Sequence, residues 1–148
     1  MLDSIRALTH IGVCVSDMDR SVAFYRDVLG FRYQRELRVD GPPTEALLQV
    51  PGAKLHAVYL ERDGFCIELL RFEEPGSPFQ PPARKLNDLG FTHLSLQVSD
   101  VDEVAAWLAS RGAVIDPGTR IEIGGAVVAI FLRDPDGLPI ELVRARTA

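Results

Sequence analysis

The chain contains an internal repeat. Residues 7–30 read ALTHIGVCVSDMDRSVAFYRDVLG, and residues 90–112 read GFTHLSLQVSDVDEVAAWLASRG. With His10 aligned on His93, both stretches contain Thr-His, an apolar run and Val-Ser-Asp-x-Asp. A repeated stretch of this length indicates one structural unit present in two copies. The repeat therefore restricts the chain to folds built from two similar halves.

The end of each half is repeated as well. Residues 64–69 read GFCIEL and residues 137–142 read GLPIEL, and an aspartate precedes each glycine. Glu68 and Glu141 occupy the same place in the two copies. The sequence thus offers two histidines and two glutamates at equivalent positions of its two halves.

Hydrophobic periodicity predicts the same order of elements in both halves. An apolar, β-branched strand comes first, then a helix with an Asp or Ser N-cap and a glycine at its end, at Gly30 or Gly112. Further strands are predicted at residues 31–39, 44–50, 55–61 and 65–72 of the first half and at 120–123, 126–132 and 138–143 of the second. Gly41-Pro42-Pro43 and Pro117-Gly118 are predicted loops, and Arg62-Asp63-Gly64 is a predicted hairpin turn.

Each half therefore has a strand, a helix and then about three strands, a βαβββ pattern. Modules 5–72 and 90–144 are joined by a proline-rich linker, residues 73–89, and 148 residues suit one domain. One helix with several strands in each half predicts an α+β fold, with two curved mixed sheets and the helices on one face. One module alone cannot close its sheet edge, so we expect the two modules to pair within a chain or between chains.

Side chains alternate along a strand, and this alternation places the repeated histidines and glutamates on the less apolar face of each strand. His10 and His93 lie on the wetter face of the first strand of each module, because the apolar residues occupy the other face. Glu68 lies in the middle of an otherwise apolar strand, where a carboxylate is normally exposed, paired or bound to a metal. Glu141 has the same setting. All four side chains should therefore lie on the faces away from the helices.

Two imidazoles and two carboxylates form a nitrogen and oxygen ligand set that suits Zn, Fe, Ni, Co or Mn. A single histidine is more often structural, and a single strand glutamate more often faces water. Both residue types at both equivalent positions are hard to explain by packing, so the repeat favours ligation by His10, Glu68, His93 and Glu141. His56 has no counterpart in the second half and is interpreted as an ordinary strand residue.

Composition excludes other classes of function. A net charge of −5 with interspersed acids and bases argues against nucleic acid as a partner. No apolar run approaches the roughly 20 residues of a membrane helix, and no secretory signal is visible, so we expect a cytoplasmic protein that does not bind membranes. Cys14 and Cys66 have no metal-type spacing and are expected to be free, buried thiols.

The stretches THIGVCVSDMDRSVAFYRDVLGF, GFTHLSLQVSDVDEVAAWLASRGA and DPDGLPIELV resemble the vicinal oxygen chelate superfamily. This superfamily groups glyoxalase I, methylmalonyl-CoA epimerase, extradiol dioxygenases, and fosfomycin- and bleomycin-resistance proteins. The resemblance covers nearly the whole chain and implies paired βαβββ modules that form a cup-like sheet around one divalent metal ion. It also implies a homodimer, metal ligands at His10, Glu68, His93 and Glu141, and a small-molecule substrate.

The ligand set resembles that of glyoxalase I most, with the epimerase next. Extradiol dioxygenases are similar but lack the fourth carboxylate, and bleomycin-binding relatives generally lack the ligands. Cys14 stands where bacterial glyoxalase I has an arginine, and Phe72 stands where it has an asparagine. The resemblance therefore leaves open whether glutathione is the cosubstrate, and it does not choose the metal.

These observations lead to one hypothesis and two alternatives. We expect a metal-dependent lyase, isomerase or epimerase that transfers a proton next to a metal-chelated carbonyl, with Glu141 or Glu68 as the base. A ring-cleaving dioxygenase is the first alternative. A non-catalytic protein that binds a drug or metabolite is the second.

Overall fold

The computed structural model describes residues 4–77 and 85–145. The chain divides into two compact units, Met1–Gln80 and Pro81–Ala148, and each is considered by itself. Within the described residues, no helix is both long enough and apolar enough to cross a membrane.

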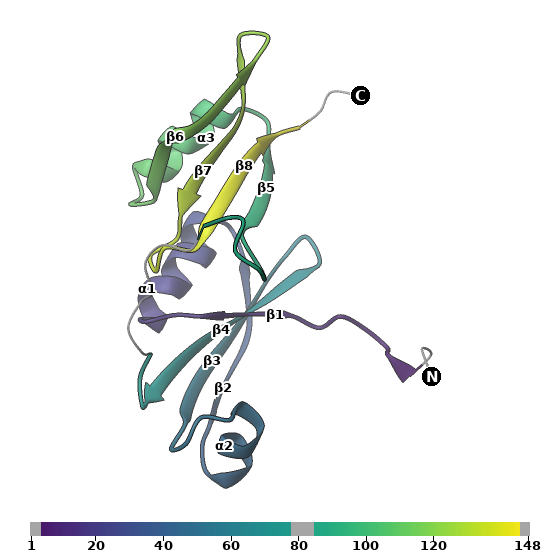
Figure 1. Cartoon of the computed structure of the whole chain (residues 1–148), viewed down its shortest axis with the longest axis vertical. Coiled ribbons are helices and arrows are strands. Elements are labelled where there is room, and N and C mark those ends of the chain that lie inside the picture. Colours follow the sequence, from purple (N-terminus) through teal and green to yellow (C-terminus); the bar gives the residue numbers. More distant parts are fainter. Residues whose placement is uncertain (1–3, 78–84, 146–148) are drawn as a thin grey trace. The chain divides into compact units, whose positions relative to one another are not determined.

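The first unit is a four-stranded mixed sheet with helices (Figure 1). Its strand order is β1-β4-β3-β2, with β1 parallel to β4 and the other pairs antiparallel. Its elements are β1 (Ile11–Cys14), α1 (Met18–Ala23), a π-helical continuation η2 (Phe24–Val28), β2 (Arg32–Val39), α2 (Pro42–Leu48), β3 (Lys54–Arg62) and β4 (Phe65–Glu74).

The second unit repeats this topology (Figure 1). Its strand order is β5-β8-β7-β6, and β5 is parallel to β8 just as β1 is to β4. Its elements are β5 (Leu94–Val98), α3 (Val101–Ala109), β6 (Val114–Ile123), β7 (Ala126–Arg133) and β8 (Pro139–Arg144). The predicted α+β class with two βαβββ modules is confirmed.

The predicted helix ends are also confirmed. The side chain of Asp17 accepts a hydrogen bond from the Arg20 amide at 2.9 Å, and Asp100 accepts one from the Glu103 amide at the same distance. Gly30 and Gly112 follow the helices with φ of 74° and 89°, which a glycine adopts without strain. The repeated Val-Ser-Asp motif therefore encodes the same turn from strand to helix in both units.

The core of each unit lies between one sheet face and its helix. In the first unit α1 packs against β3 and β4, whose Leu60, Ile67 and Leu69 are buried. In the second unit α3 packs against β7 and β8, whose Leu132, Ile140 and Leu142 are buried. Since side chains alternate along a strand, the residues between them, including Glu68 and Glu141, lie on the other face.

The expected strand at residues 44–50 and the loop before it are wrong, because Pro42–Leu48 is the helix α2. A proline fits the first turn of a helix, where its missing amide has no partner to lose, so Pro42-Pro43 begins the helix. Leu48 packs against a cluster of Leu55, Ala57 and Tyr59, on the sheet face of Tyr59. Tertiary contact with β3 thus outweighs the apolar run's strand propensity.

The strand expected at residues 120–123 is longer than predicted. β6 begins at Val114 and passes through Pro117-Gly118, where its register with β7 shifts between Asp116 and Ile121. The predicted loop at Pro117-Gly118 is therefore wrong: both residues lie within β6, because proline and glycine are tolerated inside a strand at a bulge.

Candidate functional site

In the first unit, His10 and Glu68 form a contact pair. His10 immediately precedes β1, and the parallel register of β1 with β4 places Gly12 opposite Glu68. His10 Nε2 lies 3.0 Å from Glu68 Oε2. The imidazole is partly exposed, and the carboxylate is mostly buried.

The second unit contains the equivalent pair. His93 immediately precedes β5, and Ser95 lies opposite Glu141 in the register of β5 with β8. His93 Nε2 lies 3.8 Å from Glu141 Oε2. The structure therefore brings each predicted histidine to its predicted glutamate within one unit.

A threonine fixes the orientation of each imidazole. Thr9 Oγ1 lies 3.0 Å from His10 Nδ1, and Thr92 Oγ1 lies 2.8 Å from His93 Nδ1. When Nδ1 carries the proton and donates it to the threonine oxygen, Nε2 presents its lone pair toward the glutamate side. A histidine held through one nitrogen in this way is oriented to bind a metal through the other.

An aromatic ring supports each histidine from the neighbouring strands. The His10 ring meets Tyr59 edge-to-face with centroids 5.4 Å apart, and His93 meets Phe131 in the same manner at 5.3 Å. Tyr59 pairs with Glu68 across β3 and β4, and Phe131 pairs with Glu141 across β7 and β8. The two units therefore repeat a set of threonine, histidine, glutamate and aromatic ring.

The hydrogen bonds to the two carboxylates differ. The Tyr59 hydroxyl donates to Glu68 Oε1, and Glu68 Oε2 faces His10 Nε2. Ser95 Oγ donates to Glu141 Oε2 at 2.6 Å, the same oxygen that faces His93. Glu141 Oε1 has no hydrogen-bond partner among the described residues.

Tyr59 remains a hydrogen-bond donor at neutral pH. Desolvation on burial and the adjacent Glu68 carboxylate raise the pKa of its hydroxyl above the ordinary value of 10. The guanidinium of Arg35 lies 3.7 Å from the centroid of the Tyr59 ring, a cation–π contact. The hydroxyl and the ring of Tyr59 are thus both held in place.

The sequence profile of the Glyoxalase/Bleomycin resistance protein/Dioxygenase superfamily matches residues 7–142 of this chain. The chain belongs to this superfamily. The repeated sequence stretches predicted membership of this superfamily, and that prediction is confirmed.

Two bacterial relatives match this chain over most of their length. The uncharacterized protein YaeR of Escherichia coli K12 is 30% identical over 145 residues, covering 93% of this chain and 95% of YaeR. The lactoylglutathione lyase of Salmonella typhimurium LT2 is 28% identical over 143 residues, covering 95% and 94%. Plant lactoylglutathione lyases also match but are longer, and the chain spans 44% of the one named GLX1 in Arabidopsis thaliana.

Solved structures share the fold. A glyoxalase family protein from Bacillus cereus superposes with a TM-score of 0.78 at 19% identity, covering 93% of this chain and 92% of its own. At this identity the similarity establishes the architecture alone. The superfamily assignment therefore states the fold, and leaves the site and the reaction to be argued from the residues.

The donor atoms fit a divalent metal ion. Two ligands that bind one ion at about 2.1 Å in neighbouring octahedral positions lie about 3 Å apart. The Nε2 to Oε2 distance is 3.0 Å in the first unit, whereas the 3.8 Å distance in the second unit would have to shorten. Imidazole nitrogen with carboxylate oxygen suits borderline metals such as zinc, nickel, cobalt, iron and manganese. Within the described residues, no three or more His, Cys, Asp or Glu side chains of a unit form a metal-binding group. Each unit brings together one histidine and one glutamate.

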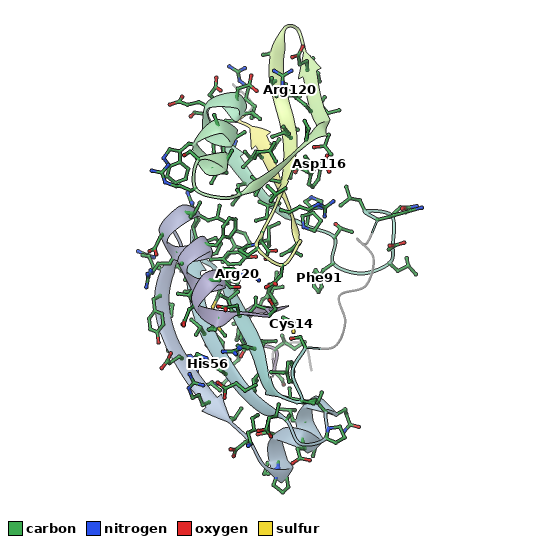
Figure 2. The ribbon with its side chains drawn as sticks, turned by 90° about the vertical axis from the view of Figure 1, so that its left-hand side faces the viewer. Cys14, Arg20, His56, Phe91, Asp116 and Arg120 are labelled. Carbon is green, nitrogen blue, oxygen red and sulfur yellow. The ribbon has the colours of Figure 1, made fainter. Side chains whose placement is uncertain are left out.

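The other residues singled out in the sequence do not belong to these pairs. Cys14 is exposed and Cys66 is half-buried, so the expectation of buried thiols is wrong for Cys14, although both are free as expected. Phe72 packs beside the Leu55 cluster. His56 is a buried strand residue on β3, 3.4 Å from Glu36, which agrees with its predicted structural role (Figure 2).

The sequence analysis did not identify the residues that contact the two histidines and the two glutamates. Thr9 and Thr92 were visible in the repeated Thr-His dipeptide, but their contact with Nδ1 requires the side-chain geometry. Tyr59 and Phe131 come from strands whose registers a single sequence does not give. Ser95 is visible only once β5 is paired with β8.

Proposed function

We propose that this protein is a divalent-metal enzyme of the glyoxalase type that moves a proton on a small oxygenated substrate. The observation that carries the proposal is the repeated pair of a threonine-oriented histidine and a glutamate, present once in each unit. His10 and Glu68 with His93 and Glu141 would supply four ligands to one ion. The two units would combine into one domain within a chain, or between the chains of a homodimer.

The bound metal would supply positive charge beside a carbonyl oxygen of the substrate. The surrounding residues would then position the substrate and move the proton. His10 and His93 present Nε2, and their threonine partners keep that nitrogen directed at the site. Such preorganised ligands lower the free energy needed to order the site at each turnover.

The hydrogen bonds favour different roles for the two glutamates. Glu68 is held by Tyr59 through Oε1, which leaves Oε2 facing His10, and only 13% of its side chain is exposed, which suits a permanent ligand. Glu141 is held through one oxygen, and 26% of its side chain is exposed, which suits a group that must move. We therefore assign the base to Glu141, with Glu68 as an anchored ligand.

In this mechanism a Glu141 oxygen takes a proton from the carbon next to the substrate carbonyl. The electron pair of that C–H bond shifts into the carbonyl, whose oxygen becomes negative. Glu141 then returns the proton to the former carbonyl carbon, while the hydroxyl proton of the first carbon passes to the negative oxygen, which gives isomerisation. Delivery of a proton from water to the opposite face of the first carbon gives epimerisation instead. The relative from Salmonella typhimurium LT2 is named a lactoylglutathione lyase, and this name supports an enzyme that acts on a small oxygenated substrate.

Metal content is the first test. Elemental mass spectrometry on protein purified without added metal should find close to one ion per pair of units, and the His93→Ala variant should lose it. Proton exchange is the second test. NMR in deuterium oxide should show C–H exchange on at least one member of a panel of α-keto compounds and acyl thioesters.

The outcomes separate the candidate functions. Full metal occupancy without exchange on any panel member would contradict the proposed reaction, and oxygen consumption with catechols would then indicate a ring-cleaving dioxygenase. Absence of metal from both proteins, even after reconstitution, would contradict the ligand assignment. Tight ligand binding that a chelator does not change would then indicate a binding protein.

A further inference from the structure

The second unit contains a pocket that the four candidate ligands do not form. Its volume is about 340 Å³. The residues that line it come from the segment before β5 and from β6, β7 and β8: Lys85, Leu86, Asp116, Thr119, Phe131, Arg133 and Pro139.

The pocket adjoins the histidine and glutamate pair of the same unit. Phe131 lines the pocket, and its ring also meets the His93 ring at a centroid distance of 5.3 Å. Pro139 lines it as well and lies two residues before Glu141, on the same face of β8. A molecule in this pocket would therefore lie beside His93 and Glu141.

The charge of the pocket is positive. Lys85 and Arg133 contribute two cations and Asp116 one carboxylate. Arg133 Nη1 donates to the carbonyl of Gly137 at 3.1 Å, which fixes the guanidinium, while Nη2 lies 3.9 Å from Asp116 Oδ2. That separation is too long for a hydrogen bond, so Nη2 can still donate to an incoming oxyanion.

One wall of the pocket is the bulge of β6. Thr119 Oγ1 accepts a hydrogen bond from the Phe131 amide at 2.8 Å and donates one to the Asp116 carbonyl at 2.7 Å. Asp116 and Arg120 both lie on this strand, at separate places along it (Figure 2). The bulge therefore needs no rearrangement to receive a ligand, which favours binding.

The first unit does not repeat the cation. Phe131 corresponds to Tyr59, and the residue two positions after Tyr59, at the place of Arg133, is Glu61. Glu61 is held by the Arg32 guanidinium and by the Gly64 amide at the hairpin. The charge at Arg133 is thus a property of one unit and not a requirement of the shared fold.

We propose that this pocket binds an anionic group of the substrate, a carboxylate or a phosphate, through Lys85 and Arg133. Leu86, Phe131 and Pro139 provide apolar surface that limits competing water around the two cations. Because the pocket adjoins His93 and Glu141, the anionic group would orient the reacting carbonyl of the substrate toward them. This last step rests on the proposed function, whereas anion binding itself does not.

Anion binding can be measured without metal or substrate. Inorganic phosphate or acetate is titrated into ¹⁵N-labelled, metal-free protein while amide shifts are followed by NMR. We expect saturable shifts at Phe131 and Arg133, and about fivefold weaker binding in both the Lys85→Gln and the Arg133→Gln variants. The stronger of the two probes identifies which anion the pocket prefers.

Arg111→Gln is the matched control, because Arg111 stacks on Trp107 at 3.9 Å from the ring centroid and does not line the pocket. This variant should bind the probe as the wild type does. Arg133 also stabilises the turn at Gly137, so the Arg133→Gln variant could fail to fold. Lys85→Glu is therefore a second variant, and its reversed charge should abolish anion binding.

Absence of saturable shifts with either anion, or equal binding by the wild type and both lysine variants, would overturn the proposal. Metal content of each variant separates this result from the proposed function. Retained metal with unchanged anion binding contradicts the pocket alone. If the wild type binds the anion but no metal, and the Lys85 and Arg133 variants lose anion binding, the result supports the anion site and contradicts the proposed metal enzyme.

Discussion

Tyr59 donates a hydrogen bond to Oε1 of Glu68, and the corresponding residue of the second unit, Phe131, has no hydroxyl to do the same for Glu141. Both aromatic rings meet the histidine of their unit edge-to-face. The repeat is therefore symmetric in its ligand candidates and asymmetric in the groups that hold them. This difference is the basis for assigning separate roles to the two glutamates.

The Tyr59→Phe variant should keep the fold and weaken metal binding by about 10- to 100-fold, because a hydrogen bond to a carboxylate contributes about 1.5–3 kcal/mol. Titration of metal-free protein with zinc, followed by calorimetry, measures the affinity. Tyr33→Phe is the control, since Tyr33 is an exposed tyrosine of the same unit. Equal affinities of the wild type and both variants would show that Tyr59 does not position Glu68.

Glutamine substitutions should separate the two carboxylates. Glu141→Gln should retain most of the metal and lose proton exchange by about 10²–10⁴-fold, because an amide cannot act as a general base. Glu68→Gln should instead lose metal. Metal content and deuterium exchange, measured on the same preparations, check both outcomes, and the reverse pattern would exchange the roles assigned to the two residues.

Thr119→Val should destabilise the second unit by about 1–3 kcal/mol. Valine has nearly the same shape but leaves the Phe131 amide and the Asp116 carbonyl without the partner that Thr119 provides. Urea unfolding measures the loss, and Thr119→Ser, which keeps the hydroxyl, should recover most of it. A valine variant as stable as the wild type would show that water replaces both hydrogen bonds.

The contribution of Glu61 to stability should depend on pH. Hydrogen bonds from Arg32 and from the Gly64 amide lower the pKa of Glu61 below its ordinary value of 4.5. A carboxyl group with a lowered folded-state pKa stabilises the fold above the unfolded-state value, and this contribution is lost as the pH falls through the folded-state pKa.

Glu61→Gln should therefore reduce the denaturation midpoint at pH 7 and have progressively less effect below pH about 4.5. Chemical denaturation at both pH values measures this difference. Glu45→Gln is the control, because the Glu45 side chain has no charged partner among the described residues. A pH-independent difference at Glu61 would indicate a packing effect of the substitution and not its charge.

Local sequence signals predicted most elements because their physical causes are local. Asp17 and Asp100 cap helices through bonds to amides three residues away. Asp63 and Gly64 adopt φ of 51° and 82°, as a two-residue hairpin turn requires. The helix α2 was missed because its stability depends on packing of Leu48 against residues of β3, which no local pattern reports.

The sequence by itself determined that the fold has two βαβββ halves and that His10, Glu68, His93 and Glu141 occupy equivalent places in them. Only the tertiary structure decided that Glu68 lies 3.0 Å from His10, that Tyr59 and Ser95 hold different carboxylates, and that Arg133 faces a pocket beside His93. Repetition and alternation are properties of neighbouring residues, so they can be read along the chain. Strand register joins residues far apart in sequence, and it is fixed by the packing of the whole sheet.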